Sequence, residues 1–402
     1  MIQMTKLHYE FDQDYFCGNW IPWISGFIDK VRILLLIYRV NIQKKGDSNI
    51  SVLLRIMTNY LQILAISMSF NLHFPAYMTN AFSRASSVGN SAGILLSVDW
   101  LLLKSIFVDY FNNIAYLKLA GIALIPIALI GTSAISFRLI FFKDTHKFLR
   151  YLWVTSITIF FVLHPTLTAY CLRIFKWDYI GNGMQRVEMD IRTECWSPQH
   201  LKWIFILGKS FKFMILGIPM LIIYAIGFPV AIFIILYVNR NRLNDPKVLS
   251  YFILLYQGLR SERYYWELVN TFRKFVLLSL QVFIPNNFKV VKSLIGSIVL
   301  FLSSVIQARF KPFKIGAVSE LEHREMISSI LTLYGGIIFV QQPNELQSLS
   351  IIIFVLVVIM NLRFWSLWIF WTLCVYRKHK IIDKFLQWAK KSFCIKIDEV
   401  RL

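Results

Sequence analysis

Residues 349–373 read LSIIIFVLVVIMNLRFWSLWIFWTL and contain a single charge, Arg363. A helix needs about 20 apolar residues to cross the hydrocarbon core of a bilayer, so this stretch is long enough. Similar apolar stretches lie at 51–70, 115–141, 149–170, 213–237, 269–284, 291–307 and 327–340. Each is expected to be a helix, because lipid offers no hydrogen-bond partner to an open strand. The sequence therefore predicts an all-α, polytopic membrane protein with about eight transmembrane helices.

The composition agrees with this class. Hydrophobic residues make up 57% of the 402 residues, charged residues only 16%, and the mean hydropathy is +0.57. A soluble domain carries about 25% charged residues. The net charge is +21, but no nucleic-acid-binding module is recognisable. The expected partners are therefore the lipid bilayer and its anionic headgroups, and no nucleic acid.

Signatures of catalysis are absent from the sequence. There is no GxSxG, no phosphate-binding loop and no HExxH. The five cysteines form no CxxC pair. We therefore expect no enzymatic activity, no metal site and no cofactor.

The distribution of positive charge predicts the orientation. If residues 1–48 are cytosolic, the loops at 143–150, 239–274 and 309–325 and the tail from 377 also fall inside, and all are rich in Lys and Arg. The connections at 71–113, 285–289 and 341–347 fall outside and carry few basic residues, while 173–212 has mixed signs. The positive-inside rule thus favours cytosolic N- and C-termini. We divide the chain into a cytosolic or interfacial segment (1–48), a transmembrane domain (49–376) and a basic tail (377–402).

Two apolar segments that contain charges resist assignment as spans. Residues 20–40 suit a helix that lies in the membrane interface, and residues 92–110 suit an outer amphipathic helix or a re-entrant element.

The densest polar cluster, at 256–274, leads into the fifth predicted span. One stripe of a helix there would carry Glu267, Asn270 and Lys274, with Gln281 further along. Such a track suits an ion path or a gate, because polar groups in lipid usually need a protein partner. An interfacial anchor, with the neighbouring aromatic residues at headgroup level, is the alternative interpretation.

A second cluster, at 307–325, follows the sixth span. Its acids and bases could form an exposed cap on the seventh helix, or could couple this segment to the basic loop at 239–274. The residues of this candidate cytosolic coupling are Arg263, Arg273, Glu320, Glu322, Arg324 and Glu325.

Three further features carry weaker predictions. Cys171 and Cys195 both fall on the predicted outer side, where a disulfide could persist. The fourth span holds Gly217, Pro219, Gly227 and Pro229, which indicate close packing and bending, or a broken helix that lines a solute cavity. The tail combines aromatic residues with bases that could bind anionic lipid, namely Arg377, Lys378, Lys380, Lys384, Lys390 and Lys391.

An ordered set of short motifs resembles a known membrane family. The motifs are SVLLRIMTNYLQ from residue 51, LHPT from 163, MDIRTECW from 189, YYWELVNTFRK from 264, QARFKP from 307, ELEHRE from 320 and LYGG from 333. Together they resemble a ciliate and protist family with a TRP C-terminal-type domain, similar to the fungal TRP-like channel and flavin-carrier group. The resemblance covers about residues 50–375.

The resemblance implies a cation channel or calcium-linked membrane protein. Such domains usually follow a cysteine-rich ectodomain, which this sequence lacks, so a standalone or truncated member is expected. Relatives often carry a cysteine near the position of Trp177, which weighs against the disulfide.

The leading hypothesis is that the chain is a subunit of a TRP-like cation channel. A homo-oligomer is one assembly that such a subunit could form. Its candidate pore or gate residues are Glu267, Asn270, Lys274, Gln281 and Gln307. The alternatives are a non-conducting receptor-like or scaffolding membrane protein and, with less support, a solute carrier.

Overall fold

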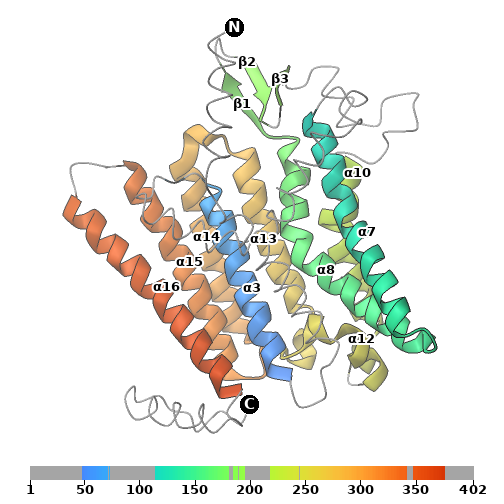
Figure 1. The fold of residues 1–402 in the computed structure, drawn as a ribbon. Helices are drawn as coiled ribbons and strands as arrows, with labels where there is room; N and C mark the ends of the chain where they lie inside the picture. Colours follow the sequence, from blue (N-terminus) through green and yellow to red (C-terminus); the bar gives the residue numbers. More distant parts are fainter. Residues whose placement is uncertain are drawn as a thin grey trace, which may run out of the picture.

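The computed structural model describes residues 48–70, 72, 114–180, 184–188, 190–194, 218–243, 245–341 and 347–375. The predicted interfacial segments at 20–40 and 92–110 lie outside these residues, as does the tail from 377. Within them the chain is mostly helical, and Figure 1 shows the long helices running side by side as a bundle.

Seven helices of 18 residues or more form most of this bundle. They are α3 (Ser48–Met68), α7 (Ile114–Ile140), α8 (Thr145–Arg173), α13 (Trp266–Phe283), α14 (Lys289–Phe310), α15 (Gly316–Gln341) and α16 (Gln347–Val375). An eighth rod is composite, made of α10 (Ile218–Met220), the π-helix η2 (Leu221–Gly227) and α11 (Phe228–Val238). Shorter elements are η3 (Arg240–Arg242), α12 (Pro246–Tyr256), η4 (Ser261–Arg263) and η5 (Asn286–Phe288). Each of the eight predicted spans thus overlaps helix over most of its length, apart from positions 213–217, which are not described.

Six of these helices are long and apolar enough to cross a membrane. Among the described residues they are Ile50–Met68, Leu119–Ile140, Thr145–Arg173, Leu221–Val238, Asn286–Phe310 and Ile351–Val375. The predicted spans in α13 and α15 are not among these six. Glu267, Arg273 and Lys274 interrupt α13, and the uncharged part of α15 is short, because charged residues occupy its first turns. The chain is therefore a helical membrane protein by length and composition, with six clear candidate spans.

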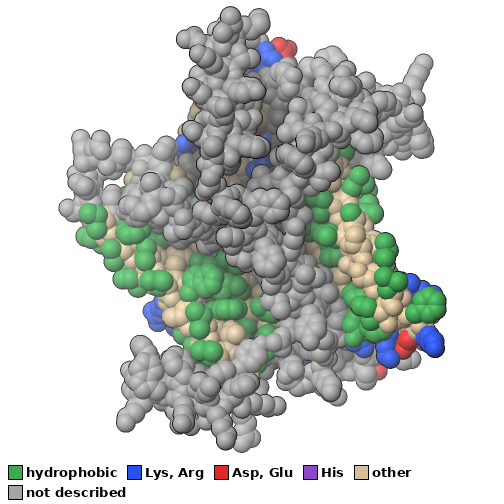
Figure 2. All heavy atoms as spheres, in the orientation of Figure 1, with side chains coloured by type: hydrophobic (Ala, Val, Ile, Leu, Met, Phe, Trp, Pro, Cys, Tyr) green, Lys and Arg blue, Asp and Glu red, His purple; other side chains and the backbone are tan. Residues whose placement is uncertain are grey.

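The outer surface of the bundle is apolar where α7 and α16 lie. Large side chains such as Ile127 and Leu139 on α7, and Ile352 and Leu362 on α16, are more than half exposed. Figure 2 shows hydrophobic side chains gathered along both helices, with Lys and Arg beyond the end of the α7–α8 hairpin. Exposed apolar area of this extent marks a surface that faces something other than water, such as lipid or another protein.

The interior contains two hydrophobic clusters. The larger one surrounds α3, whose residues Ile56, Tyr60 and Ile63 are almost fully buried against α13, α15 and α16. The smaller one joins α7, α8 and η2 around Leu119 and Leu163. Protein therefore covers α3 on nearly all sides, although its sequence alone is apolar enough for lipid.

A set of contacts gathers the basic loops at one end of the bundle. The backbone N–H of Arg260 donates to Pro312 O at 2.8 Å, and Trp368 Nε1 donates to Leu53 O at 2.8 Å. The start of α3, the end of α16 and the α14–α15 turn thus lie together, and Figure 1 places α12 and the α7–α8 turn at this end as well. We call this the basic end, comprising residues 141–150, 239–265 and 309–316.

A small antiparallel sheet lies at the opposite end, in the connection at 173–212, for which no strands were predicted. Strands β1 (Trp177–Ile180), β2 (Met184–Val187) and β3 (Asp190–Glu194) pair in the order β1-β2-β3. Lys176 Nζ lies 2.5 Å from Glu188 Oε2 and closes the base of the sheet. Strands are possible here because this segment extends beyond the helices (Figure 1), where water can satisfy the edge of a sheet.

Candidate functional site

A cluster of charged side chains is buried where α3, α13 and α15 meet. Its six ionisable members are at most 5% exposed, and they are Arg55, Glu267, Arg273, Lys274, Glu322 and Glu325. Three are basic and three acidic, so their formal charges cancel. We refer to them, with Asn59, Gln62 and Asn270, as the buried network. Charged groups are expensive in the interior unless they are paired and hydrogen-bonded.

The spacing of polar residues on α13 explains why they face inward. Glu267, Asn270 and Lys274 follow one another at three and four residues, so they share one side of the helix. All three are buried, whereas Phe272 on the other side of the helix is 66% exposed. The polar side of α13 therefore faces the bundle and its apolar side faces outward, the reverse of a helix in a water-soluble protein.

Arg55 links α3 to the basic end and to α13. Its Nη1 donates to Leu254 O at 2.9 Å and its Nη2 donates to Gln257 O at 2.8 Å, while its Nε lies 3.4 Å from Glu267 Oε2. A guanidinium suits this place because its planar donors can serve several acceptors at once. One side chain thereby fixes the end of α12 against two long helices.

Asn270 lies between two carboxylates. Its Nδ2 donates to Glu322 Oε1 at 3.0 Å and lies 3.5 Å from Glu267 Oε2. Asn59 Nδ2 donates to the other Glu267 oxygen at 3.4 Å. These amide donors separate the two acids and connect α13 with α3 and α15.

Lys274 extends the network along α3 and towards α8. Its Nζ donates to Asn59 Oδ1 at 2.6 Å and to Gln62 Oε1 at 2.7 Å, and it lies 5.6 Å from the centre of the Phe161 ring. Gln62 Nε2 in turn donates to Val162 O at 3.1 Å. The ammonium group is therefore held by two amide oxygens and by an aromatic face.

The pair formed by Arg273 and Glu325 is less well satisfied. The closest approach of their charged atoms is 3.8 Å. Among the described residues, Arg273 Nε and Nη2 and both Glu325 oxygens have no hydrogen-bond partner, and the same holds for Glu322 Oε2. Buried polar atoms without a partner are rare in folded proteins, so this pair is the least well satisfied part of the network.

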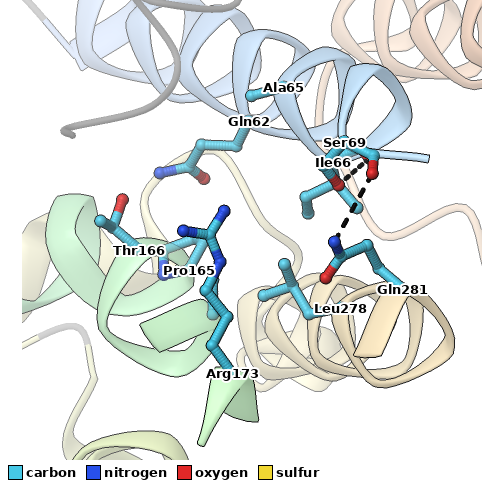
Figure 3. Close-up of a pocket in the computed structure, with 10 residues that line it drawn as sticks. Gln62, Ala65, Ile66, Ser69, Pro165, Thr166, Arg173, Leu278 and Gln281 are labelled. Carbon is cyan, nitrogen blue, oxygen red and sulfur yellow. Dashed lines mark hydrogen bonds between the residues drawn. The ribbon is translucent and has the colours of Figure 1, made fainter. Parts of the chain in front are cut away.

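A small cavity lies beyond Lys274, at the end of the network remote from the basic end. It has a volume of about 50 Å³ and is lined by Gln62, Thr166, Arg173 and Gln281, among others. Figure 3 shows the Arg173 side chain reaching towards Gln62, and a long hydrogen bond of 3.5 Å from Gln281 Nε2 to Ser69 O. The wall of this space includes several polar side chains, and the space is large enough for water. Polar groups thus continue from this cavity, through Lys274, to the basic end.

The structure separates the five predicted pore residues into three places. Glu267, Asn270 and Lys274 belong to the buried network, and Gln281 lines the small cavity. Gln307 lies apart from them on α14 near the basic end, where its Nε2 donates to Ser319 O at 3.4 Å. None of the five lies on the outer surface of the bundle, since each is at most 5% exposed.

The six predicted coupling residues also divide. Arg273, Glu322 and Glu325 are part of the buried network. In contrast, Glu320 and Arg324 form an exposed pair one helical turn apart, as expected of a cap.

Arg263 is half-buried, and its guanidinium lies 4.8 Å from the centre of the Phe310 ring. The loops that hold these residues are joined by backbone hydrogen bonds, including one of 2.9 Å from Lys314 N to Gly258 O. The segments at 239–274 and 307–325, which were considered for coupling, are therefore in direct contact.

The polar face of α3 escaped the sequence analysis. Arg55, Asn59 and Gln62 were read as part of an apolar span, yet they take part in most of the contacts described above for the buried network. Their spacing of four and three residues places them on one side of a helix, and this was the available signal.

His164 satisfies a carbonyl in the composite rod. Residue 229 is proline and has no N–H for the carbonyl four residues earlier, that of Ala225. His164 Nε2 lies 3.2 Å from this oxygen, and because a carbonyl only accepts, Nε2 must carry the proton. The predicted bending site is thus the π-helix η2, in which Ile222 O would lie 2.8 Å from a Cβ at Gly227.

The remaining predicted sites lie partly or wholly outside the described residues. Cys171 is buried, but Cys195 lies outside the described residues, so the disulfide stays a prediction. The lipid-binding tail also lies outside them. No group of three or more His, Cys, Asp or Glu side chains suited to a metal ion occurs in the described part of the chain.

Comparisons with known proteins give one informative likeness. Over 203 residues, 48% of its length, this chain is 25% identical to "Cysteine repeat modular protein A" of Toxoplasma gondii. The match covers 6% of that protein, so this chain corresponds to a small part of it. No protein-family model matches the chain, and no solved structure matches it significantly.

Proposed function

We propose that this chain is a subunit of a TRP-like cation channel in which the buried network acts as the gate. In this proposal α13 and α15 cross the membrane together with the six apolar helices, and the basic end and both termini lie in the cytosol. The observation that carries it is a set of six buried charged side chains inside a bundle whose outer surface is apolar. Ionisable groups at such positions usually serve an ion path or a switch.

The contacts indicate how such a gate would work. The network joins α3, α13 and α15 by ion pairs and hydrogen bonds, and the polar side chains of the cavity beside Gln62 extend it towards the far end. Within one chain the network is closed, since its members are nearly inaccessible. We infer that opening moves α13 relative to α3, which would break the contacts of Lys274 and let water and ions reach Glu267.

Ion flux through vesicles that contain the purified chain tests this proposal. We expect cation flux above that of protein-free vesicles. In Glu267→Gln the flux should change by about tenfold, because a shift of about 1.4 kcal/mol in the free-energy difference between the closed and open states changes their ratio tenfold. Phe272→Leu is the matched control, since this residue lies on the exposed side of the same helix. Absence of flux under voltage, membrane tension and calcium would contradict the proposal.

A non-conducting receptor or scaffold is the second candidate. It is favoured by the exact balance of three bases and three acids, because a network that only holds helices together needs no net charge. In that case Glu267→Gln would lower stability without any flux to alter. Flux in the wild-type chain therefore decides between the two candidates.

A further inference from the structure

A second cavity, with several charged side chains in its wall, lies at the basic end, apart from the buried network. It has a volume of about 400 Å³ and lies between the end of α14, the start of α15 and the backbone around Arg260. This volume is in the range of small-molecule sites, which are about 300–1,000 Å³. Nothing in the proposed gating uses this cavity.

The position of the cavity along α14 places it at the depth of lipid headgroups. Leu302, Val305, Ile306 and Phe310 are between 39% and 53% exposed and form the apolar outer side of the last turns of α14. The next residue, Lys311, is charged, exposed and lines the cavity. Because an apolar helix surface ends where the hydrocarbon ends, the cavity opens in the polar region just beyond it.

The walls of the cavity favour an anion. Arg260, Lys311 and Lys314 line it, against one acid, Glu320, which is already paired with Arg324. Arg260 Nε donates to Phe313 O at 3.3 Å, which holds the guanidinium at the rim. The N-terminus of α15, a helix of 26 residues, also borders the cavity at Gly316 and adds its unpaired N–H groups.

Gln307 places a hydrogen-bond acceptor in the cavity, which an anion without a donor group cannot satisfy. Its side chain is 1% exposed and lines the cavity, and its Nε2 donates to Ser319 O. Its Oε1 has no hydrogen-bond partner among the described residues. This oxygen can only accept, so the ligand that completes the site must bring a donor such as a hydroxyl group.

From these contacts we propose that the cavity binds a phosphorylated polyol. Its phosphate groups bind Arg260, Lys311 and Lys314, and a neighbouring hydroxyl donates to Gln307 Oε1. This chemistry has two sources, the headgroup of an inositol phospholipid in the membrane and a soluble inositol phosphate. The site is independent of conduction, so it does not rest on the proposed channel function.

The backbone offers a variant that removes charge without disturbing the fold. Lys311 has a left-handed conformation, with φ of 41°, at the end of α14. Glycine adopts this conformation without strain, so Lys311→Gly should fold at least as well as the wild type. The double variant Lys311→Gly/Lys314→Ala therefore removes two positive charges from the site. Lys143→Ala/Lys147→Ala is the matched control, which removes two charges from the α7–α8 turn at the same end.

The test measures binding of four probes to the purified full-length chain in detergent micelles. The probes are a short-chain phosphatidylinositol bisphosphate, inositol trisphosphate, a short-chain phosphatidylserine and inorganic phosphate. We expect the site variant to bind the bisphosphate about 30-fold more weakly, at about 1 kcal/mol for each basic residue, and the control variant to change its affinity by less than about threefold. Gln307→Leu should weaken binding of the polyol probes about fivefold or more, and leave that of inorganic phosphate unchanged.

Each outcome either tests the proposal or identifies the source of the ligand. Binding of both inositol probes indicates that the headgroup alone suffices, and binding of the lipid alone indicates a membrane source. Phosphatidylserine binding as tightly as the bisphosphate, or an equal loss in the site and control variants, would overturn the proposal. So would the absence of binding by both inositol probes.

Discussion

Replacing one member of the Arg273–Glu325 pair should be far more harmful than replacing both. The two side chains are 3% and 0% exposed, and their charged atoms come no closer than 3.8 Å. Arg273→Met would leave Glu325 as a buried charge without its partner. Breaking a buried pair in this way typically costs about 3–5 kcal/mol of unfolding free energy.

The double variant Arg273→Met/Glu325→Leu should recover most of this loss. Both Glu325 oxygens and two Arg273 nitrogens have no hydrogen bond within the described part of the chain, so the pair gains little to offset its desolvation. Replacement of a buried pair by apolar side chains of similar volume is often neutral, or stabilising by about 1–4 kcal/mol. We therefore expect the double variant to lie within about 1 kcal/mol of the wild type or above it.

Unfolding in mixed micelles, with a denaturing detergent titrated into a mild one, gives the four free energies of this cycle. Phe272→Leu is the control on the exposed side of α13 and should change the value by no more than about 0.5 kcal/mol. A double variant as unstable as the sum of its two single variants would refute the reasoning. A stable double variant would also serve in the flux assay, where altered flux could not be attributed to misfolding.

Two further substitutions test other parts of the fold. His164→Phe should lower the unfolding free energy by about 1–3 kcal/mol, because it leaves the buried Ala225 carbonyl without a donor; an unchanged value in the same micelle titration would show that this bond contributes nothing. Gly258→Ala should destabilise by at least about 1 kcal/mol, since Gly258 has φ of 77° and the new Cβ would lie 2.7 Å from Val52 Cγ2. Gly131→Ala, where no atom lies within 4 Å of the new Cβ, should by comparison be neutral or stabilising in thermal unfolding, and equal effects of the two alanines would contradict this account.

The limits of the seventh predicted span show where sequence reasoning stopped short. The span was predicted at 327–340, with Glu322 and Glu325 in the charged segment that enters it, but α15 begins at Gly316. The helix continues through these residues because Asn270 and Arg273, on α13, provide partners for them. A short stretch of sequence shows that a charge would have to be buried at Glu322. It does not show the partner that compensates for this, Asn270, which lies 52 residues away in the chain.

The sequence by itself determined where the long helices lie and at which ends the basic loops occur. Both follow from local composition, since span length and the placement of Lys and Arg are read within a short window. Only the tertiary structure decided that Arg55, 212 residues before Glu267, forms an ion pair with it, and that Lys274 reaches Asn59 rather than an outer surface. Which polar sides face one another depends on how the helices rotate and pack, and that is set by contacts between distant segments.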